Sequence, residues 1–141
     1  MFLPNKKDRC PKMAKILVVE DVLDTREFVH LHLTEEGFQV ILASNGQEGL
    51  YLAMAEHPDL IITDVEMPVL DGVEMIKLLR AEKETHNIPI LVLTAYGTDV
   101  MDNAIRAGAN RAMMKPVLLE GMVTDVRELI SAAALKRRPH D

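Results

Sequence analysis

The chain has 141 residues, of which 48% are hydrophobic and 27% are charged, and this balance is typical of one globular domain rather than a disordered chain. Its formal net charge of −6 argues against binding to nucleic acid or to anionic membranes. The single cysteine, Cys10, excludes a disulfide within the chain, a CxxC redox pair and a cysteine-rich zinc site. Because no apolar run approaches the length of a membrane span, a cytoplasmic location is expected.

Residues 1–13 show no hydrophobic periodicity and are predicted to be a flexible N-terminal extension. Beyond them, apolar runs of strand length alternate with segments of helical periodicity. The predicted strands are Ile16–Val19, Phe38–Leu42, Leu60–Ile62, Ile88–Leu93 and Ala112–Met114. Strands that are apolar throughout, without a period of two, indicate a parallel sheet covered on both faces.

The segments between and after these strands predict five helices, because apolar residues recur in them at spacings of three and four. The fourth, at about 99–107, has only a thin apolar stripe. The residues expected to face the core from the other helices are Phe28 and Leu31, then Leu50, Ala53 and Met54, then Val73, Ile76 and Leu79, and finally Met122, Val126, Leu129, Ile130 and Ala133. Met113 and Met114 are also expected in the core. Residues 14–136 are therefore predicted to form one α/β domain, and residues 137–141 a C-terminal tail.

Parallel sheets bind ligands at the carboxyl ends of their strands, where this chain gathers polar residues. The groups that follow the predicted strands are Glu20 and Asp21, Asp64, Thr94 with the Ala95 amide, and Lys115. Like-charged carboxylates about 4 Å apart repel by roughly 4 kcal/mol at an effective dielectric of 20, and protonation or a divalent cation relieves this. Oxygen ligands without histidine or cysteine suit Mg²⁺ or Mn²⁺.

A hydrated Mg²⁺ leaves room for a phosphoryl ligand at the same edge of the sheet. The Lys115 ammonium, the Thr94 hydroxyl and the Ala95 amide are donors for three phosphoryl oxygens. A carboxylate can itself accept a phosphoryl group as a nucleophile. Taken alone, Asp64 would be read as a solvated acid that starts a turn, and Thr94 as a strand residue with a local hydrogen bond. The partner positions favour the site.

Five motifs occur in order along the chain, namely "ILVVED", "IITDVEMPVLDG", "LVLTA", "AGAN" and "MMKP". From about residue 14 to residue 136 the chain resembles the receiver domain of two-component response regulators, in the manner of the single-domain chemotaxis regulator. The resemblance implies a flavodoxin-like three-layer sandwich, with strand order 2-1-3-4-5 and five flanking helices.

The resemblance also implies that Asp64 is phosphorylated by a sensor histidine kinase or a histidine phosphotransfer protein. Asp21, Asp64 and the backbone carbonyl of Glu66 would bind Mg²⁺, and Glu20 would reach the ion directly or through water. The catalytic set would be completed by Lys115, which pairs with Asp64 or the phosphate.

The remaining implied roles concern switching and the lifetime of the phosphoryl group. Thr94 would be the switch hydroxyl, and the Lys115–Pro116 peptide bond is expected to be cis. Relatives commonly carry Tyr or Phe at the position of Ala112, so we expect signalling here without an aromatic rotamer change. Glu66 and Tyr96 would line the path of the attacking water, so slow to intermediate self-hydrolysis is expected.

Two other functions stay open at this point. One is a Mg²⁺-dependent aspartyl-phosphate phosphohydrolase, in which Glu66 would serve as the acid/base; the other is a receiver-like docking module that is never phosphorylated. If the chain is a receiver phosphorylated on Asp64, which is the favoured interpretation, we expect it to be a phosphoacceptor rather than a conventional enzyme. No output domain is expected after residue 136, so the signal is expected to pass to a downstream protein or an absent output domain. The expected surface lies between the fourth helix, fifth strand and fifth helix, and the expected state is a monomer or a phosphorylation-promoted dimer.

Overall fold

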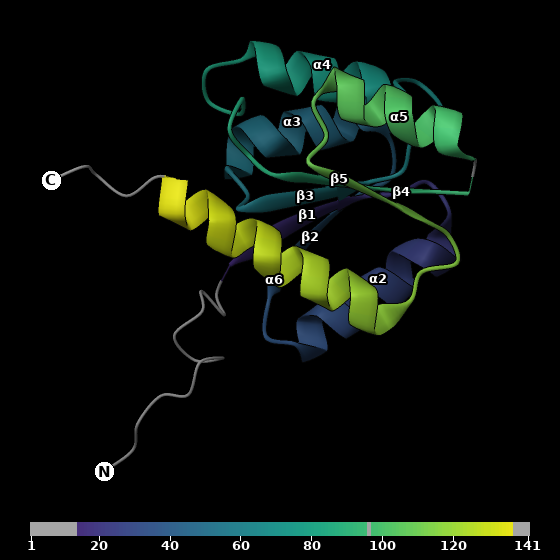
Figure 1. The fold of residues 1–141 in the computed structure, drawn as a ribbon, viewed down its shortest axis with the longest axis vertical. Coiled ribbons are helices and arrows are strands. Elements are labelled where there is room, and N and C mark those ends of the chain that lie inside the picture. Colours follow the sequence, from purple (N-terminus) through teal and green to yellow (C-terminus); the bar gives the residue numbers. More distant parts are fainter. Residues whose placement is uncertain (1–13, 96, 137–141) are drawn as a thin grey trace, which may run out of the picture.

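The computed structural model describes residues 14–95 and 97–136; the predicted extension at 1–13 and tail at 137–141 lie outside them. The elements, labelled as in Figure 1, are the strands β1 (Lys15–Val19), β2 (Gln39–Ala43), β3 (Leu60–Thr63), β4 (Ile90–Thr94) and β5 (Arg111–Met114), and the helices α2 (Leu23–Glu35), α3 (Gly46–Glu56), α4 (Gly72–Ala81), α5 (Thr98–Ala107) and α6 (Leu119–Lys136). Within the described ranges, no helix is long and apolar enough to cross a bilayer.

The five strands form one parallel sheet in the order β2-β1-β3-β4-β5, which confirms the expected flavodoxin-like topology. β1 lies between β2 and β3, and Val19 pairs with Thr63 in the register of β1 and β3. The ladder extends one step further, since the Asp64 amide donates to the Val19 carbonyl at 3.1 Å. The residues that follow β1 and β3 are therefore neighbours at the carboxyl edge of the sheet.

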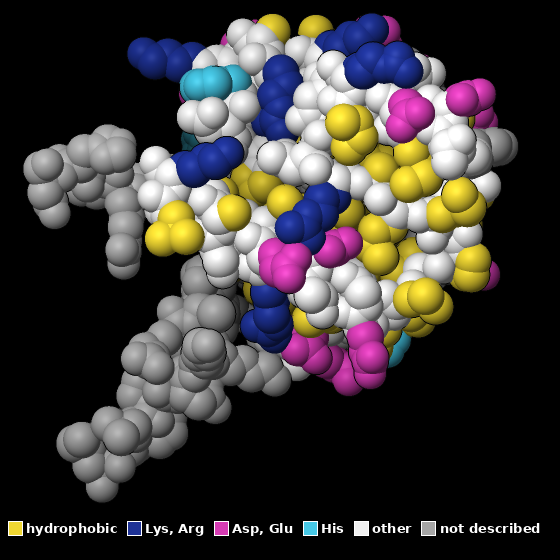
Figure 2. Space-filling model, viewed as in Figure 1, with side chains coloured by type: hydrophobic (Ala, Val, Ile, Leu, Met, Phe, Trp, Pro, Cys, Tyr) yellow, Lys and Arg dark blue, Asp and Glu magenta, His cyan; other side chains and the backbone are white. Residues whose placement is uncertain are grey.

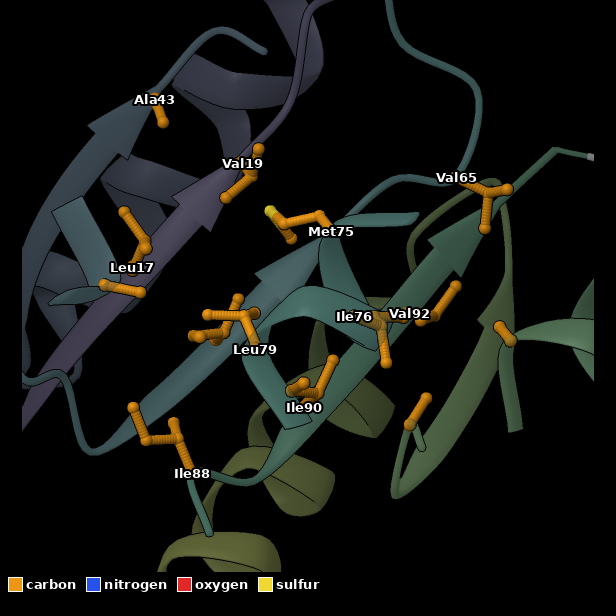
Figure 3. Packing of buried hydrophobic residues seen from close by; sticks show 14 of the residues in the cluster. Leu17, Val19, Ala43, Val65, Met75, Ile76, Leu79, Ile88, Ile90 and Val92 are labelled. Carbon is orange, nitrogen blue, oxygen red and sulfur yellow. The ribbon is translucent and has the colours of Figure 1, made fainter. Parts of the chain in front are cut away.

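Helices cover both faces of the sheet, with α3, α4 and α5 on one side and α2 and α6 on the other (Figure 1). Successive strand residues point to opposite faces, so Leu17 belongs to the core under α3, α4 and α5, whereas Ile16 and Val18 belong to the core under α2 and α6. Figure 3 shows the first of these cores, where Met75, Ile76 and Leu79 of α4 lie against Leu17, Val19, Ile90 and Val92 of the sheet. Burial on both faces explains the continuous apolar runs.

Four of the predicted core positions are wrong, namely Phe28, Leu31, Met54, which is 37% exposed, and Met114. In α2 the buried residues are Val29 and Leu33, whereas Phe28 is 38% exposed and Leu31 57% exposed. The helix carries apolar residues on more than one face, and spacing alone did not show which face meets the sheet. Met114 is 48% exposed because it lies at the end of an edge strand.

All five predicted strands are present, and their ends differ from the prediction by at most two residues. The largest difference is at β4, which begins at Ile90 rather than Ile88. Pro89 has no N–H for a strand ladder, although its carbonyl accepts a hydrogen bond from the Ile61 amide at 2.9 Å. The buried apolar run is therefore longer than the strand.

The loop between β3 and α4 turns sharply away from the sheet edge. The Gly72 amide donates to the Val65 carbonyl at 2.7 Å, and the Asp71 side chain caps α4 by accepting from the Glu74 amide at 2.9 Å. A Cβ at Gly72 would lie 2.2 Å from the Asp64 carbonyl oxygen. Within this loop Val69 has φ 75° and is 74% exposed. The loop thus leaves the Asp64 side chain at the open edge of the sheet.

Replacing Gly72 with alanine should destabilise the fold, because the added methyl group would overlap the backbone of Asp64. We expect a loss of about 2–4 kcal/mol in the free energy of unfolding, measured by urea denaturation. Gly97→Ala is the matched control, since a Cβ there meets no atom within 4 Å. A Gly72→Ala variant as stable as Gly97→Ala would contradict this packing.

Candidate functional site

The buried carboxylate of Glu20, 3% exposed, follows directly after β1. Its Oε1 accepts a hydrogen bond from the Lys115 Nζ at 2.7 Å, and its Oε2 accepts one from the Val22 amide at 3.1 Å. The backbone carbonyl of the same residue accepts a hydrogen bond from the Arg26 Nη1 at 2.8 Å. Both the side chain and the backbone of Glu20 are thereby fixed in place.

Asp64 follows β3 and is 8% exposed. Its Oδ1 accepts a hydrogen bond from the Val65 amide at 2.6 Å, and its Oδ2 accepts one from the Lys115 Nζ at 3.0 Å. The Lys115 ammonium therefore lies between the carboxylates of Glu20 and Asp64 and forms an ion pair with each. Three strand ends, those of β1, β3 and β5, supply these three groups.

The charges at this site do not balance. Burial raises the pKa of Glu20, and the nearby charge of Asp64 raises this pKa further. The hydrogen bond from Lys115 lowers the pKa of Glu20 but does not offset these two effects. Burial alone would lower the pKa of Lys115, but its hydrogen bonds to Glu20 and Asp64 outweigh burial and raise that pKa. One ammonium thus serves two buried carboxylates, and a further cation would relieve the excess negative charge.

A third acid completes a candidate metal centre. Carboxylate oxygens of Glu20, Asp21 and Asp64 all lie within 4.8 Å of one another, and Asp21 is the exposed member. A donor set made only of oxygen fits Mg²⁺ or Mn²⁺ rather than a softer metal. The cluster therefore suits such a cation for two reasons: its donors are all oxygens, and its negative charge is not fully compensated.

The remaining predicted residues surround these groups. Thr94 is wholly buried at the end of β4, and its carbonyl accepts a hydrogen bond from the Lys115 amide at 2.7 Å. Ala95 and Glu66 are both exposed, and the bond between Lys115 and Pro116 is cis, as expected. Tyr96 lies outside the described residues.

Ala112 lies on β5, away from the charged groups. It pairs with Val92 in the register of β4 and β5, and it packs as a partly buried residue against the core under α3, α4 and α5. It is thus on the sheet, near α5, and not among the groups at the strand ends.

Residues 16–127 match the family model of the response regulator receiver domain. The chain belongs to this family. The receiver domain is 38% identical, over 121 residues and 85% of its length, to the transcriptional regulatory protein CusR of Escherichia coli strain K12, of which the match covers 52%. It spans about half the length of the curated relatives it matches.

Solved structures agree with the sequence match. The receiver domain resembles the chemotaxis response regulator CheY4 of Vibrio cholerae, with a TM-score of 0.78, 32% identity and coverage of 83% of this chain and 98% of that one. It also resembles the receiver domain of the sensor histidine kinase PA1611 from Pseudomonas aeruginosa PAO1, with a TM-score of 0.79, 28% identity and coverage of 84% and 98%. That structure has a magnesium ion coordinated in its active site cleft.

Two contacts in the receiver domain were not predicted from sequence. The Val22 amide holds the Glu20 carboxylate, and the Arg26 guanidinium holds the Glu20 carbonyl. The sequence offers one signal for the second contact: an arginine stands in the first turn of the helix that follows the acidic end of β1. Together these contacts fix the backbone that carries Asp21.

Asp21→Asn should weaken Mg²⁺ binding by about tenfold or more, because the exposed member of the cluster loses its charge. In the wild type, Mg²⁺ at 100 times its dissociation constant should add about 2.7 kcal/mol to the free energy of unfolding. Thermal unfolding with and without Mg²⁺ measures both effects.

Asp24→Asn serves as the control, since Asp24 is an exposed acid in the first turn of α2 and is outside the cluster. Equal Mg²⁺ responses of the two variants would argue against a metal centre at Asp21.

Proposed function

We propose that this receiver domain accepts a phosphoryl group on Asp64 from a phosphohistidine of a sensor kinase or a histidine phosphotransfer protein. The observation that carries the proposal is the position of the Lys115 ammonium between the buried carboxylates of Glu20 and Asp64. A lysine in this place neutralises the acceptor before transfer and remains beside the phosphoryl oxygens after it.

In this reaction a carboxylate oxygen of Asp64 forms the new bond to phosphorus. The bond between phosphorus and the imidazole nitrogen of the donor breaks, and its electron pair stays on that nitrogen. Lys115 holds one phosphoryl oxygen, and the Thr94 hydroxyl and the Ala95 amide hold the others. Positioning and charge neutralisation are most of what such a transfer requires of a protein.

We assign Mg²⁺ to the acidic cluster. Asp21, Asp64 and the backbone carbonyl of Glu66 would hold it, with Glu20 as a direct or water-mediated ligand, and Mn²⁺ would bind in the same way. When bound, the ion supplies positive charge beside the phosphoryl oxygens. The uncompensated charge of the site and the magnesium ion in the related Pseudomonas receiver domain support this assignment.

Loss of the phosphoryl group should be slow to intermediate. Glu66, exposed two residues after Asp64, and Tyr96, two residues after Thr94, are the residues that we expect to tune the attacking water. The protein would act through self-catalysed transfer and self-hydrolysis rather than as a conventional enzyme. A phosphoryl half-life of seconds in the isolated protein would argue against this expectation.

Switching is proposed to depend on Thr94 and the segment that follows it. Ala112 has no ring that could change rotamer, and its small side chain already packs against the core. A movement of the segment after β4 would then reach α5 directly.

The surface made by α5, β5 and α6 is the proposed site for the downstream partner. Figure 2 shows hydrophobic side chains gathered on this side of the molecule, over the region of β5 and α5. Ile105, Met114 and Leu118 are 43%, 48% and 71% exposed. The partner would be a downstream protein or an output domain of a longer chain. The receiver domain would bind it as a monomer or as a phosphorylation-promoted dimer. We expect no direct contact of this domain with nucleic acid or a membrane.

Asp64→Asn should abolish the transfer of labelled phosphate from a phosphorylated histidine kinase to this protein, because the acceptor oxygen is lost. The wild type should become labelled, and the label should be removed by mild alkali or hydroxylamine, as for an acyl phosphate. Asp102→Asn, an exposed acid on α5, should be labelled like the wild type.

Labelling of Asp64→Asn at the wild-type rate would refute the assignment. The same assay with a small phosphodonor such as phosphoramidate separates the chemistry from recognition of the kinase. A wild type that accepts from neither donor would contradict the proposed function itself.

A further inference from the structure

At the edge of the sheet opposite the acidic cluster, the Arg80 guanidinium of α4 is wholly occupied. Its Nε and Nη2 donate to the Gly108 carbonyl at 3.0 and 2.8 Å. Its Nη1 donates to the carbonyls of His86 and Ile88 at 2.9 and 2.7 Å, and Nη2 also donates to Asn110 Oδ1 at 2.9 Å. All five N–H groups of a guanidinium are thereby used. Among the described residues its acceptors are neutral, with no carboxylate in an ion pair with it.

The acceptors belong to two segments, residues 86–88 before β4 and residues 108–110 between α5 and β5. Gly108 ends α5, and Asn110 precedes β5. Asn110 is itself tied to β4, since its Oδ1 accepts from the Ile90 amide at 2.8 Å and its own amide donates to the Ile90 carbonyl at 2.9 Å. Arg80 therefore fastens the C-terminal end of α5 to α4 and to the start of β4.

Gly108 is shaped for this contact. Its φ of 126° is in a region that favours glycine, and a Cβ there would lie 2.8 Å from the Arg80 Cγ. The positive charge of Arg80 also lies at the C-terminal end of α5, where the helix dipole is negative. Geometry and charge thus hold this end of the helix in one place.

The opposite end of α5, which follows β4 and Thr94, is held far less. Its N-cap, Gly97, makes no side-chain capping bond, and a Cβ at Gly97 would meet nothing within 4 Å. Along the whole helix only Ala104, in the C-terminal half, is buried, whereas Val100 in the N-terminal half is only partly buried against the core. The end of α5 near the acidic cluster therefore has fewer contacts to break than the end at Gly108.

We propose that Arg80 makes the C-terminal end of α5 a fixed pivot, so that a change at the acidic cluster swings the N-terminal half of the helix instead of sliding the whole helix. This inference rests on the proposed function, because phosphorylation of Asp64 is the change that would start the movement. Arg80 is a positioning residue here, far from the reacting atoms. The helix has 10 residues and is about 15 Å long, so a small rotation about Gly108 displaces its first turn most.

The test is amide hydrogen exchange along α5 in the full chain, with and without Mg²⁺ and beryllofluoride as a phosphoryl analogue. In the wild type the analogue should change exchange at about residues 98–103 and leave residues 105–109 unchanged. In Arg80→Met the change should extend over the whole helix, and exchange at residues 105–109 should rise by about tenfold or more, because the bonds of the guanidinium are lost. Arg80→Lys should resemble Arg80→Met, since an ammonium lacks the planar fork.

Ile130→Val is the stability control, since Ile130 is buried on the other face of the sheet. If Arg80→Met raises exchange in α5 no more than Ile130→Val, or if its response to the analogue stays confined to the first half of α5, the pivot is refuted. A wild-type response that covers the whole helix also refutes the pivot and leaves the proposed function standing. A wild type with no response anywhere refutes the proposed function, and the pivot with it.

Discussion

The site depends on one ammonium group shared by two buried carboxylates. The Lys115 Nζ lies 2.7 Å from Glu20 Oε1 and 3.0 Å from Asp64 Oδ2. The two buried carboxylates are stabilised further because each also accepts a hydrogen bond from a backbone amide. Buried charges need such partners, since removal from water is costly for each of them. Because negative charge remains at this cluster, a cation and an anionic phosphoryl group can bind there together.

The fold supplies the close approach that this interaction requires. Strands β1 and β3 are neighbours and end in register, so their acids meet, while β5 supplies the lysine from two strands further along the sheet. Helices on both faces bury the strands and leave only the strand ends open. A parallel sheet buried in this way is rigid, and rigidity at the strand ends suits a transfer in which the protein mainly positions charges.

Much of this could be predicted from the sequence, because hydrophobic runs and strand-end residues are local signals. The five strands, their order and the meeting of Glu20, Asp21, Asp64 and Lys115 are confirmed. What could not be predicted are contacts in which a side chain binds a distant backbone carbonyl, as Arg80 binds Gly108, since an amide carbonyl is the same in every residue. The buried face of α2 was missed for a related reason: several of its faces are apolar, and only the packed sheet selects Val29 and Leu33.

The loop after Asp64 has a consequence for the evolution of the chain. Val69 is a β-branched residue with φ 75°, and the Leu70 amide closes a tight turn around it by donating to the Pro68 carbonyl at 2.9 Å. Such a backbone conformation costs free energy wherever glycine or asparagine is absent. The sequence is therefore not at its stability optimum, and selection for heat resistance alone would be expected to replace this valine early.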